Sequence, residues 1–342
     1  MRRVLIPEGN KAIIEIIDKP KLGYGEILLK VAYCGICGSD LHAFKGKHPF
    51  VPLPATPGHE FSGKISLIGE GVSEFEIGDR VTVEPSLVCN KCYNCKSGRY
   101  NICSELRVMG CQGDGAMADF IVIPANKAIS LPDNLSLKHA TLVEPLAVGV
   151  HAVTRGGNLL NKNIVVIGAG MIGLAVLICV VKAGAKRIIV TDLSDDRLEM
   201  AKNLGATSTI NVSKINPVEK ILSEQPHEGI DVVFECVGIE KSIRDAMDLL
   251  RKGGRVVVVG VFGNEVKINM ANVQDREQEI IGSLMYTRSD FIKAIQMITN
   301  ASFPLEMFIT KTFPLEKVEE AFRAALDTKT NLKVTFEINK EN

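Results

Sequence analysis

Tryptophan is absent from this 342-residue chain, and aromatic residues make up only 5% of it. Lys and Arg together number 40, as do Asp and Glu, so the formal net charge is zero. This balance excludes a global field that would attract nucleic acid or an anionic membrane. The chain also lacks a signal-peptide apolar region and any run near the roughly 18 apolar residues of a membrane span. We therefore expect a cytoplasmic protein with small-molecule partners and no nucleic-acid or membrane partner.

The hydrophobic pattern changes character near residue 150. Before it, short segments rich in Val and Ile and bounded by Gly, Pro or Asp predict antiparallel strands. After it, mostly continuous apolar runs alternate with helical segments, which is typical of a parallel sheet buried on both faces. The expected strands of the first part are 26–32, 61–68, 80–84 and 119–123. Those of the second are 164–167, 187–191, 207–211, 231–234, 255–259 and 279–284, and the tail contributes helices 290–299 and 315–327 and strand 333–337.

Four cysteines share the short, polar stretch C-N-K-C-Y-N-C-K-S-G-R-Y-N-I-C, namely Cys89, Cys92, Cys95 and Cys103. Three thiols spaced by two residues and a fourth after a short excursion can surround one zinc ion, with Zn–S bonds of about 2.3 Å. Four thiolates leave no open position, so this zinc is expected to be structural. Two disulfides are the alternative, and the cytoplasmic setting favours metal.

A glycine-rich loop follows the first strand of the second part, in I-V-V-I-G-A-G-M-I-G. Gly168, Gly170 and Gly173 permit a tight turn, close approach of a pyrophosphate and close packing of helix on strand. Asp192, about 20 residues later, can accept the adenosine ribose hydroxyls and repel a 2′-phosphate, which predicts NAD rather than NADP. Alternatively, Asp192 is an ordinary polar residue at the start of a loop. Arg197 either weakens the preference for NAD over NADP or stacks on the adenine ring of the cofactor.

A second group of potential ligands comes from two separate segments of the first part. Cys37 lies in C-G-I-C-G-S-D-L-H, and His59 and Glu60 lie in P-G-H-E-F-S-G. One thiolate, one imidazole and one carboxylate form a mixed shell that leaves a position for substrate, as catalytic zinc requires. A histidine after Pro-Gly can equally be a turn residue without a ligand role.

Together these motifs resemble the zinc-dependent medium-chain dehydrogenase/reductase family, in its polyol branch of sorbitol and butanediol dehydrogenases. The resemblance also covers G-D-R-V-T-V-E-P and V-E-P-L-A-V-G-V-H-A, and so nearly the whole chain. It implies an α/β fold with a GroES-like, β-rich catalytic domain plus a Rossmann domain with a doubly wound parallel sheet. The expected boundaries are 1–149 for the catalytic domain, 150–286 for the NAD-binding domain and 287–342 for a segment returning to the catalytic domain.

The resemblance also assigns expected roles to individual residues. The catalytic zinc would be bound by Cys37 and His59, with Glu144 as a ligand directly or through water. Glu60 would be an alternative ligand during exchange, or else a carboxylate that supports the ligands, and Asp40 would accept the imidazole N–H of His59. A proton relay would use Ser39 and His42. Cofactor contacts would include Met171 and Ile172 in the glycine loop and, by analogy with the fold, Val237 and Gly260; Tyr286 would contact substrate.

The implied reaction is reversible hydride transfer between a secondary alcohol and NAD, giving a ketone. Ala43 and Met285 replace a tyrosine and an arginine of sorbitol dehydrogenases, which favours a less polar pocket or a smaller diol. Threonine and sugar acids remain alternative substrates, and an NAD-responsive regulator is the non-enzymatic alternative.

The strand 279–284 is a plausible sheet edge, so a homodimer or homotetramer is expected. Four further cysteines are interpreted as small core residues: Cys34, Cys111, Cys179 and Cys236.

Overall fold

A computed structural model describes residues 1–224 and 229–340 of the chain. The protein forms two compact units, Met1–Glu144 with Thr287–Asn342, and Pro145–Tyr286. Helix α4 (Val143–Gly156) begins in the first unit and continues into the second. Within the described ranges, no helix is long and apolar enough to cross a membrane.

The first unit is built around a β-sheet whose strand order is β16-β17-β3-β4-β5-β9, with β8 also paired to β3. Its core is apolar and includes the fully buried Ile27, Leu29 and Phe336. The strands are β1 (Arg2–Leu5), β2 (Ile13–Ile16), β3 (Glu26–Gly35), β4 (Glu60–Ile68), β5 (Arg80–Val83), β6 (Ser86–Leu87), β7 (Arg107–Val108), β8 (Phe120–Pro124), β9 (Ala128–Ser130), β16 (Ile309–Pro314) and β17 (Lys333–Glu337). The helices are α1 (Gly38–Phe44), α2 (Tyr93–Lys96), α3 (Leu137–Ala140), α10 (Arg288–Thr299) and α11 (Val318–Leu326), with 3-10 turns at Tyr100–Ile102, Ala125–Lys127, Leu305–Met307 and Leu315–Lys317.

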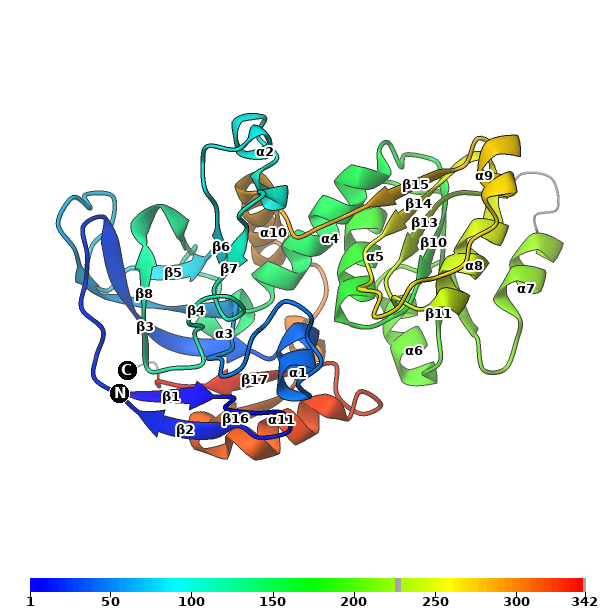
Figure 1. Cartoon of the computed structure of the whole chain (residues 1–342). Helices are drawn as coiled ribbons and strands as arrows, with labels where there is room; N and C mark the ends of the chain where they lie inside the picture. Colours follow the sequence, from blue (N-terminus) through cyan, green and yellow to red (C-terminus); the bar gives the residue numbers. More distant parts are fainter. Residues whose placement is uncertain (225–228, 341–342) are drawn as a thin grey trace. The chain divides into compact units, whose positions relative to one another are not determined.

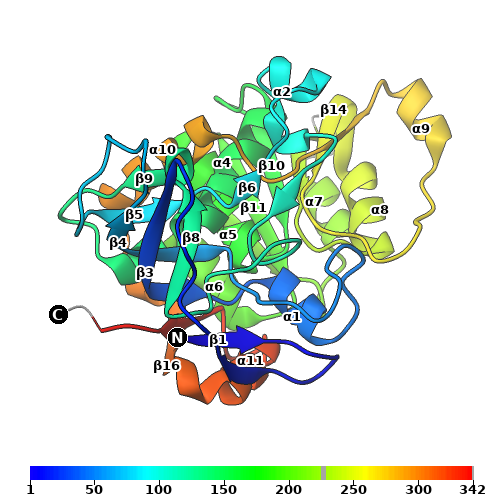
Figure 2. The ribbon, with the colours of Figure 1, turned by 60° about the vertical axis from the view of Figure 1, so that its left-hand side comes forward.

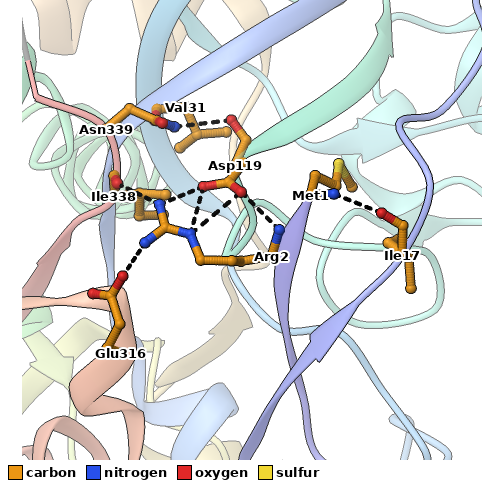
Figure 3. Close-up of polar contacts among 8 residues, drawn as sticks. All are labelled: Met1, Arg2, Ile17, Val31, Asp119, Glu316, Ile338 and Asn339. Atoms are coloured by element: carbon orange, nitrogen blue, oxygen red, sulfur yellow. Dashed lines mark hydrogen bonds and ion pairs between the residues drawn. The ribbon is translucent and has the colours of Figure 1, made fainter.

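The segments from Met1 and up to residue 340 both belong to this unit, and α11 lies beside β2 and β16 (Figures 1 and 2). The Arg2 guanidinium donates to Asp119 at 3.0 Å through Nε, forms an ion pair with Glu316 and donates to the Ile338 carbonyl at 3.1 Å. Asn339 donates to the carbonyl of Asp119 at 3.0 Å (Figure 3). The bonds of Arg2 to Ile338 and of Asn339 to Asp119 join segments more than 200 residues apart in sequence and help to hold the end of β17 in this unit.

The second unit has six parallel strands in the order β12-β11-β10-β13-β14-β15, which is the doubly wound arrangement of dinucleotide-binding domains. Helices cover both faces of the sheet (Figure 1). Consecutive residues of β10, such as Val165 and Val166, are completely buried, which explains its continuous apolar run. The strands are β10 (Asn163–Ile167), β11 (Arg187–Asp192), β12 (Ser208–Asn211), β13 (Ile230–Glu235), β14 (Leu250–Val258) and β15 (Glu279–Gly282); the helices are α5 (Met171–Lys182), α6 (Asp195–Asn203), α7 (Pro217–Glu224), α8 (Glu240–Leu249) and α9 (Met270–Asp275).

The expected α/β fold class is confirmed, and differences are confined to individual elements. Strand β14 begins at Leu250 rather than at residue 255, because a register shift after Ile230 lets the strand continue through two glycines. The expected helix 315–327 is a 3-10 turn followed by α11, which ends at Leu326. The short strands β1, β2, β6, β7, β9 and β16 were not predicted, and the expected strand 279–284 ends at Gly282. Cys111 and Cys236 are half-buried, so only Cys34 and Cys179 fit the expectation of core cysteines.

Candidate functional site

Three potential metal ligands meet where neighbouring strands of the first unit end or begin. Cys37 caps α1 directly after β3, while His59 precedes and Glu60 begins β4, the strand paired with β3. The Cys37 thiol, an imidazole nitrogen of His59 and a carboxylate oxygen of Glu60 all lie within 4.8 Å of one another. Within the described residues, His59 Nδ1 is buried and has no hydrogen-bond partner. A compact set of sulfur, nitrogen and oxygen donors fits zinc.

Asp40 supports this group from α1. Its carboxylate accepts N–H bonds from Cys37 at 2.8 Å and Gly58 at 3.3 Å, which holds both ligand-bearing segments. Asp40 Oδ1 lies 3.7 Å from His59 Nδ1, an ion-pair distance that is too long for a hydrogen bond. Burial lowers the pKa of His59, but the Asp40 carboxylate and the Cys37 thiol outweigh it, so this pKa stands well above its ordinary value.

Lys333, the first residue of β17, completes the group and was missed in the sequence analysis. Its Nζ lies 2.6 Å from both carboxylate oxygens of Glu60 and donates to the Ile36 carbonyl at 3.2 Å. Burial is the largest influence and lowers the pKa of Lys333, but Glu60, Cys37 and Glu144 together outweigh it, so the pKa is raised and the ammonium is favoured. The sequence offered no clear signal, because in K-V-T-F-E the polar Lys333, Thr335 and Glu337 alternate with apolar residues as on a half-exposed strand. Cys111 was also missed; its thiol contacts the His59 side chain.

The other residues expected at this site differ in their exposure. Glu144 is buried in the first turn of α4, and its charge raises the pKa of Lys333, although it is not one of the three grouped ligands. Ser39 and His42 are one turn apart on α1, with Ser39 half-buried and His42 exposed. Tyr286 is completely buried in the second unit.

The four-cysteine segment folds around α2 into a thiol cage in the first unit. Neighbouring Sγ atoms are 4.0 Å apart for Cys89 and Cys95, 3.9 Å for Cys92 and Cys103, and 3.5 Å for Cys103 and Cys89. A tetrahedron with Zn–S bonds of 2.3 Å has edges of about 3.8 Å, so these spacings fit one zinc ion. All four cysteines are free rather than paired in disulfides. Backbone N–H groups of Ser104 and Cys95 lower the pKa of Cys92 to about 5, which favours the thiolate that metal binding requires.

The glycine loop connects β10 to α5 in the second unit. Gly170 caps the helix, and Met171 and Ile172 open it with half-buried side chains. A Cβ added to Gly173 would collide with the carbonyl oxygen of Gly168, so glycine is needed for the loop to close on the helix. The free N–H groups of a helix N-terminus after such a loop are suited to a pyrophosphate.

Asp192 ends β11, next to β10, and its carboxylate already organises the loop. Oδ2 accepts the Ala169 N–H at 2.7 Å and Oδ1 accepts the Ser194 N–H at 2.9 Å. Arg197 is close to the loop, with Nη1 3.9 Å from the position of a Cβ on Gly170. Val237 and Gly260 follow β13 and β14 at the same carboxyl edge of the sheet, and Val237 is exposed.

Comparison with known proteins agrees with this geometry. Residues 23–133 match the family described as alcohol dehydrogenase GroES-like domain, and residues 171–300 match the family described as zinc-binding dehydrogenase. The chain is 34% identical to a sorbitol dehydrogenase of Bacillus subtilis (strain 168), over 99% of this chain and 98% of that protein. It resembles the crystal structure of 2R,3R-butanediol dehydrogenase from Bacillus subtilis, with a TM-score of 0.91, 30% identity and 99% of both chains covered.

A solved structure with a bound nucleotide is equally similar in fold. It is a candidate zinc-binding dehydrogenase from Sinorhizobium meliloti 1021 bound to NADP, with a TM-score of 0.92, 28% identity and 98% of both chains covered. The thiol-imidazole-carboxylate group, the glycine loop and these similarities lead to one assignment. The chain belongs to the polyol branch of the zinc-dependent medium-chain dehydrogenase family, and it is a zinc- and nucleotide-dependent oxidoreductase that acts on alcohols.

Proposed function

We propose that this protein oxidises a secondary alcohol group of a small diol or polyol to a ketone, reversibly, with NAD as hydride acceptor. The observation that carries the proposal is the grouping of Cys37, His59 and Glu60 within 4.8 Å in a chain that also has a dinucleotide-type glycine loop. When bound, zinc supplies Lewis-acid polarisation of the alcohol oxygen and the dinucleotide accepts the hydride.

The ligand roles follow from the donors at the strand ends. Cys37 and His59 hold the catalytic zinc, and Glu144 supplies a further carboxylate from the buried start of α4. Glu60 serves as an alternative ligand, and Lys333 neutralises it when it is not bound to metal. Four thiols in the other cage, Cys89, Cys92, Cys95 and Cys103, hold a second, structural zinc.

Ser39 and His42 move the alcohol proton toward solvent. Their spacing of three residues places them on one face of α1, directly after the ligand Cys37. Ser39 is half-buried and His42 is exposed, so the pair leads from the protein interior outward. An imidazole can both accept and donate a proton, which suits His42 to the outer end of this relay.

The preference for NAD rests on Asp192. Each of its oxygens accepts one backbone N–H, which leaves acceptor capacity for the two adenosine ribose hydroxyls and fixes a negative charge where a 2′-phosphate would lie. The dinucleotide is further contacted by Gly168, Gly170, Met171, Ile172, Arg197, Val237 and Gly260.

The substrate class is supported by the names of the relatives and by two residues, Ala43 and Met285, that replace polar residues of sorbitol dehydrogenases. One relative is a sorbitol dehydrogenase and one structural neighbour is a butanediol dehydrogenase. Ala43 and Met285 bring no hydrogen-bond donors from their side chains, which favours a small diol over a long polyol. Tyr286 is proposed to contact the substrate.

We also propose a cytoplasmic location and a homodimer or homotetramer that forms along β15, an edge strand of the six-stranded sheet.

The test is a substrate screen with purified, zinc-replete protein, in which formation of reduced nicotinamide is followed by absorbance. The panel contains 2,3-butanediol, sorbitol, xylitol, L-threonine, hexonates and simple secondary alcohols, each with NAD and with NADP. We expect turnover of a diol or polyol with NAD, its loss in Cys37→Ser, and its retention in the control Cys179→Ala on α5. Tight NADH binding without turnover on any substrate would contradict the proposal and favour a regulator.

A further inference from the structure

Glu235, the last residue of β13, is a charged side chain with 0% exposure. Its Oε1 accepts the backbone N–H groups of Val237 and Gly238, both at 2.8 Å. The Ser242 hydroxyl, in the first turn of α8, donates to the same oxygen at 2.7 Å. Three donors on one carboxylate oxygen fix the conformation of the loop 236–238, because each bond to an ionised acceptor is stronger than one between neutral groups.

The same residue also holds the loop that follows the neighbouring strand β14. The main-chain carbonyl of Glu235 accepts the N–H groups of Val259 and Gly260, both at 2.8 Å. A Cβ added to Gly260 would lie 2.8 Å from Oε2 of Glu235 and would collide with the backbone nitrogen of Gly238. The loops 236–238 and 259–261 are therefore in direct contact, and Glu235 is bonded to both.

Burying a carboxylate costs free energy, so a loop that is held by one is stabilised at a cost. Oε2 of Glu235 has no hydrogen-bond partner within the described residues, and a buried polar atom without a partner costs free energy. A charged residue with such a cost at the carboxyl edge of a parallel sheet indicates a role in a site rather than in packing.

The strand order shows which part of a dinucleotide these loops border. The glycine loop follows β10 and Asp192 ends β11, so the pyrophosphate and the adenosine ribose lie on that side of the sheet. The order reverses between β10 and β13, and a dinucleotide spans that switch point. Its nicotinamide half therefore extends over the carboxyl ends of β13 and β14. A Cβ on Gly168 would meet the Val237 side chain at 2.7 Å, so the glycine loop and the loop 236–238 adjoin.

We propose that Glu235 is a positioning residue for the nicotinamide half of the cofactor: it sets the shape of the loops 236–238 and 259–261 before the dinucleotide binds. This inference rests on the proposed binding of a nicotinamide dinucleotide. It goes further by assigning recognition of the two halves to separate carboxylates, Asp192 for the adenosine half and Glu235, through the loops, for the nicotinamide half.

The test compares two ligands that differ only in the nicotinamide. Dissociation constants of NADH and ADP-ribose are measured by calorimetry for the full-length wild type, Glu235→Gln and Ser242→Ala. Glutamine keeps the size of the side chain and removes its charge, and Ser242→Ala removes one donor. We expect NADH to bind about tenfold more weakly to Glu235→Gln and about threefold more weakly to Ser242→Ala. ADP-ribose should change by less than about twofold in both variants, because losing one hydrogen bond affects only the ligand half that depends on it.

The control is Glu240→Gln, a carboxylate on α8 that pairs with Arg244 at the surface and should leave both ligands unaffected. Equal weakening of NADH and ADP-ribose would overturn the inference, since it would mean that Glu235 supports the whole domain. Unchanged binding of both ligands would also overturn it. If Glu235→Gln fails to fold, Ser242→Ala decides the question: its dissociation constants for NADH and ADP-ribose, each divided by the wild-type value, are compared. A wild type that binds neither ligand would instead overturn the proposal of a nicotinamide dinucleotide itself.

Discussion

Lys333 and Glu60 form a buried ion pair beside the proposed catalytic zinc ligands, with the ammonium nitrogen 2.6 Å from both carboxylate oxygens. The two side chains are 4% and 1% exposed and come from β17 and β4, which flank β3 on opposite sides. Glu60 thus has the Lys333 ammonium as a positive partner, which would compete with the proposed zinc for its carboxylate. Gly35 on β3 makes room for the pair, because a Cβ there would collide with Glu60 Oε2.

Lys333→Met should destabilise the metal-free protein by about 3–5 kcal/mol, since it leaves a buried carboxylate without its partner. Added zinc should recover more stability in the variant than in the wild type, because the released Glu60 can bind the metal. Denaturant unfolding with and without zinc measures both effects. Lys311→Met, an exposed lysine on β16, is the control and should change stability by less than about 0.5 kcal/mol. Equal stability of Lys333→Met and wild type without metal would contradict the expectation.

Asp192→Asn should reduce the preference for NAD over NADP by about tenfold, because the charge that repels a 2′-phosphate is removed while the side-chain shape is kept. The measurement is kcat/KM with each cofactor on the best alcohol of the screen. Asp196→Asn, an exposed carboxylate on α6, is the matched control. An unchanged ratio in Asp192→Asn would mean that other groups decide the cofactor.

Cys103→Ser should remove one equivalent of zinc per chain, as measured by metal analysis, and should open the segment 89–103 to protease. The segment carries exposed Lys91, Lys96 and Arg99. Trypsin should therefore cut the variant here about tenfold faster than the zinc-loaded wild type, because metal binding supplies the folding free energy of such a small cage. Ser97→Ala, at an exposed serine just after α2, provides the control for a change in the same segment without loss of a thiol. Full zinc content in Cys103→Ser would exclude the four-thiolate site.

The stability of the second unit should depend on acid through Asp231. Burial raises the pKa of this carboxyl, but the Asn163 N–H and the Arg251 guanidinium lower it more, so the pKa lies below its ordinary 3.8. A lowered carboxyl pKa contributes stability above the ordinary value, and this contribution is lost as the pH falls through the folded-state pKa.

Asp231→Asn should thus lower the free energy of unfolding by about 1–2 kcal/mol at pH 7. The difference should nearly vanish at the lowest pH, where both proteins carry a neutral side chain at this position. Unfolding free energies across pH 2–7 test this, with Asp248→Asn, on the exposed face of α8, as the reference variant. A difference between wild type and Asp231→Asn that stays constant with pH would show that the charge of Asp231 is not responsible.

Features that depend on neighbours in the chain were determined by the sequence itself. The cysteine cage closes within fifteen residues, and the strand, glycine loop and helix from Ile164 to Lys182 form one local unit, so residue types and spacing were sufficient to predict them. The alternation of apolar strands and helices likewise predicted the parallel sheet.

The partners of those features were decided only by the tertiary structure. Lys333 reaches Glu60 across 273 residues because β17 pairs with β3, a register that no local pattern specifies. Glu235 lies one residue beyond the strand expected at 231–234, and its bonds to the loops 236–238 and 259–261 form only once β13 and β14 are paired. Desolvation selects such contacts: once the sheet buries a charge, a partner must be nearby, and only the fold determines which residue that is.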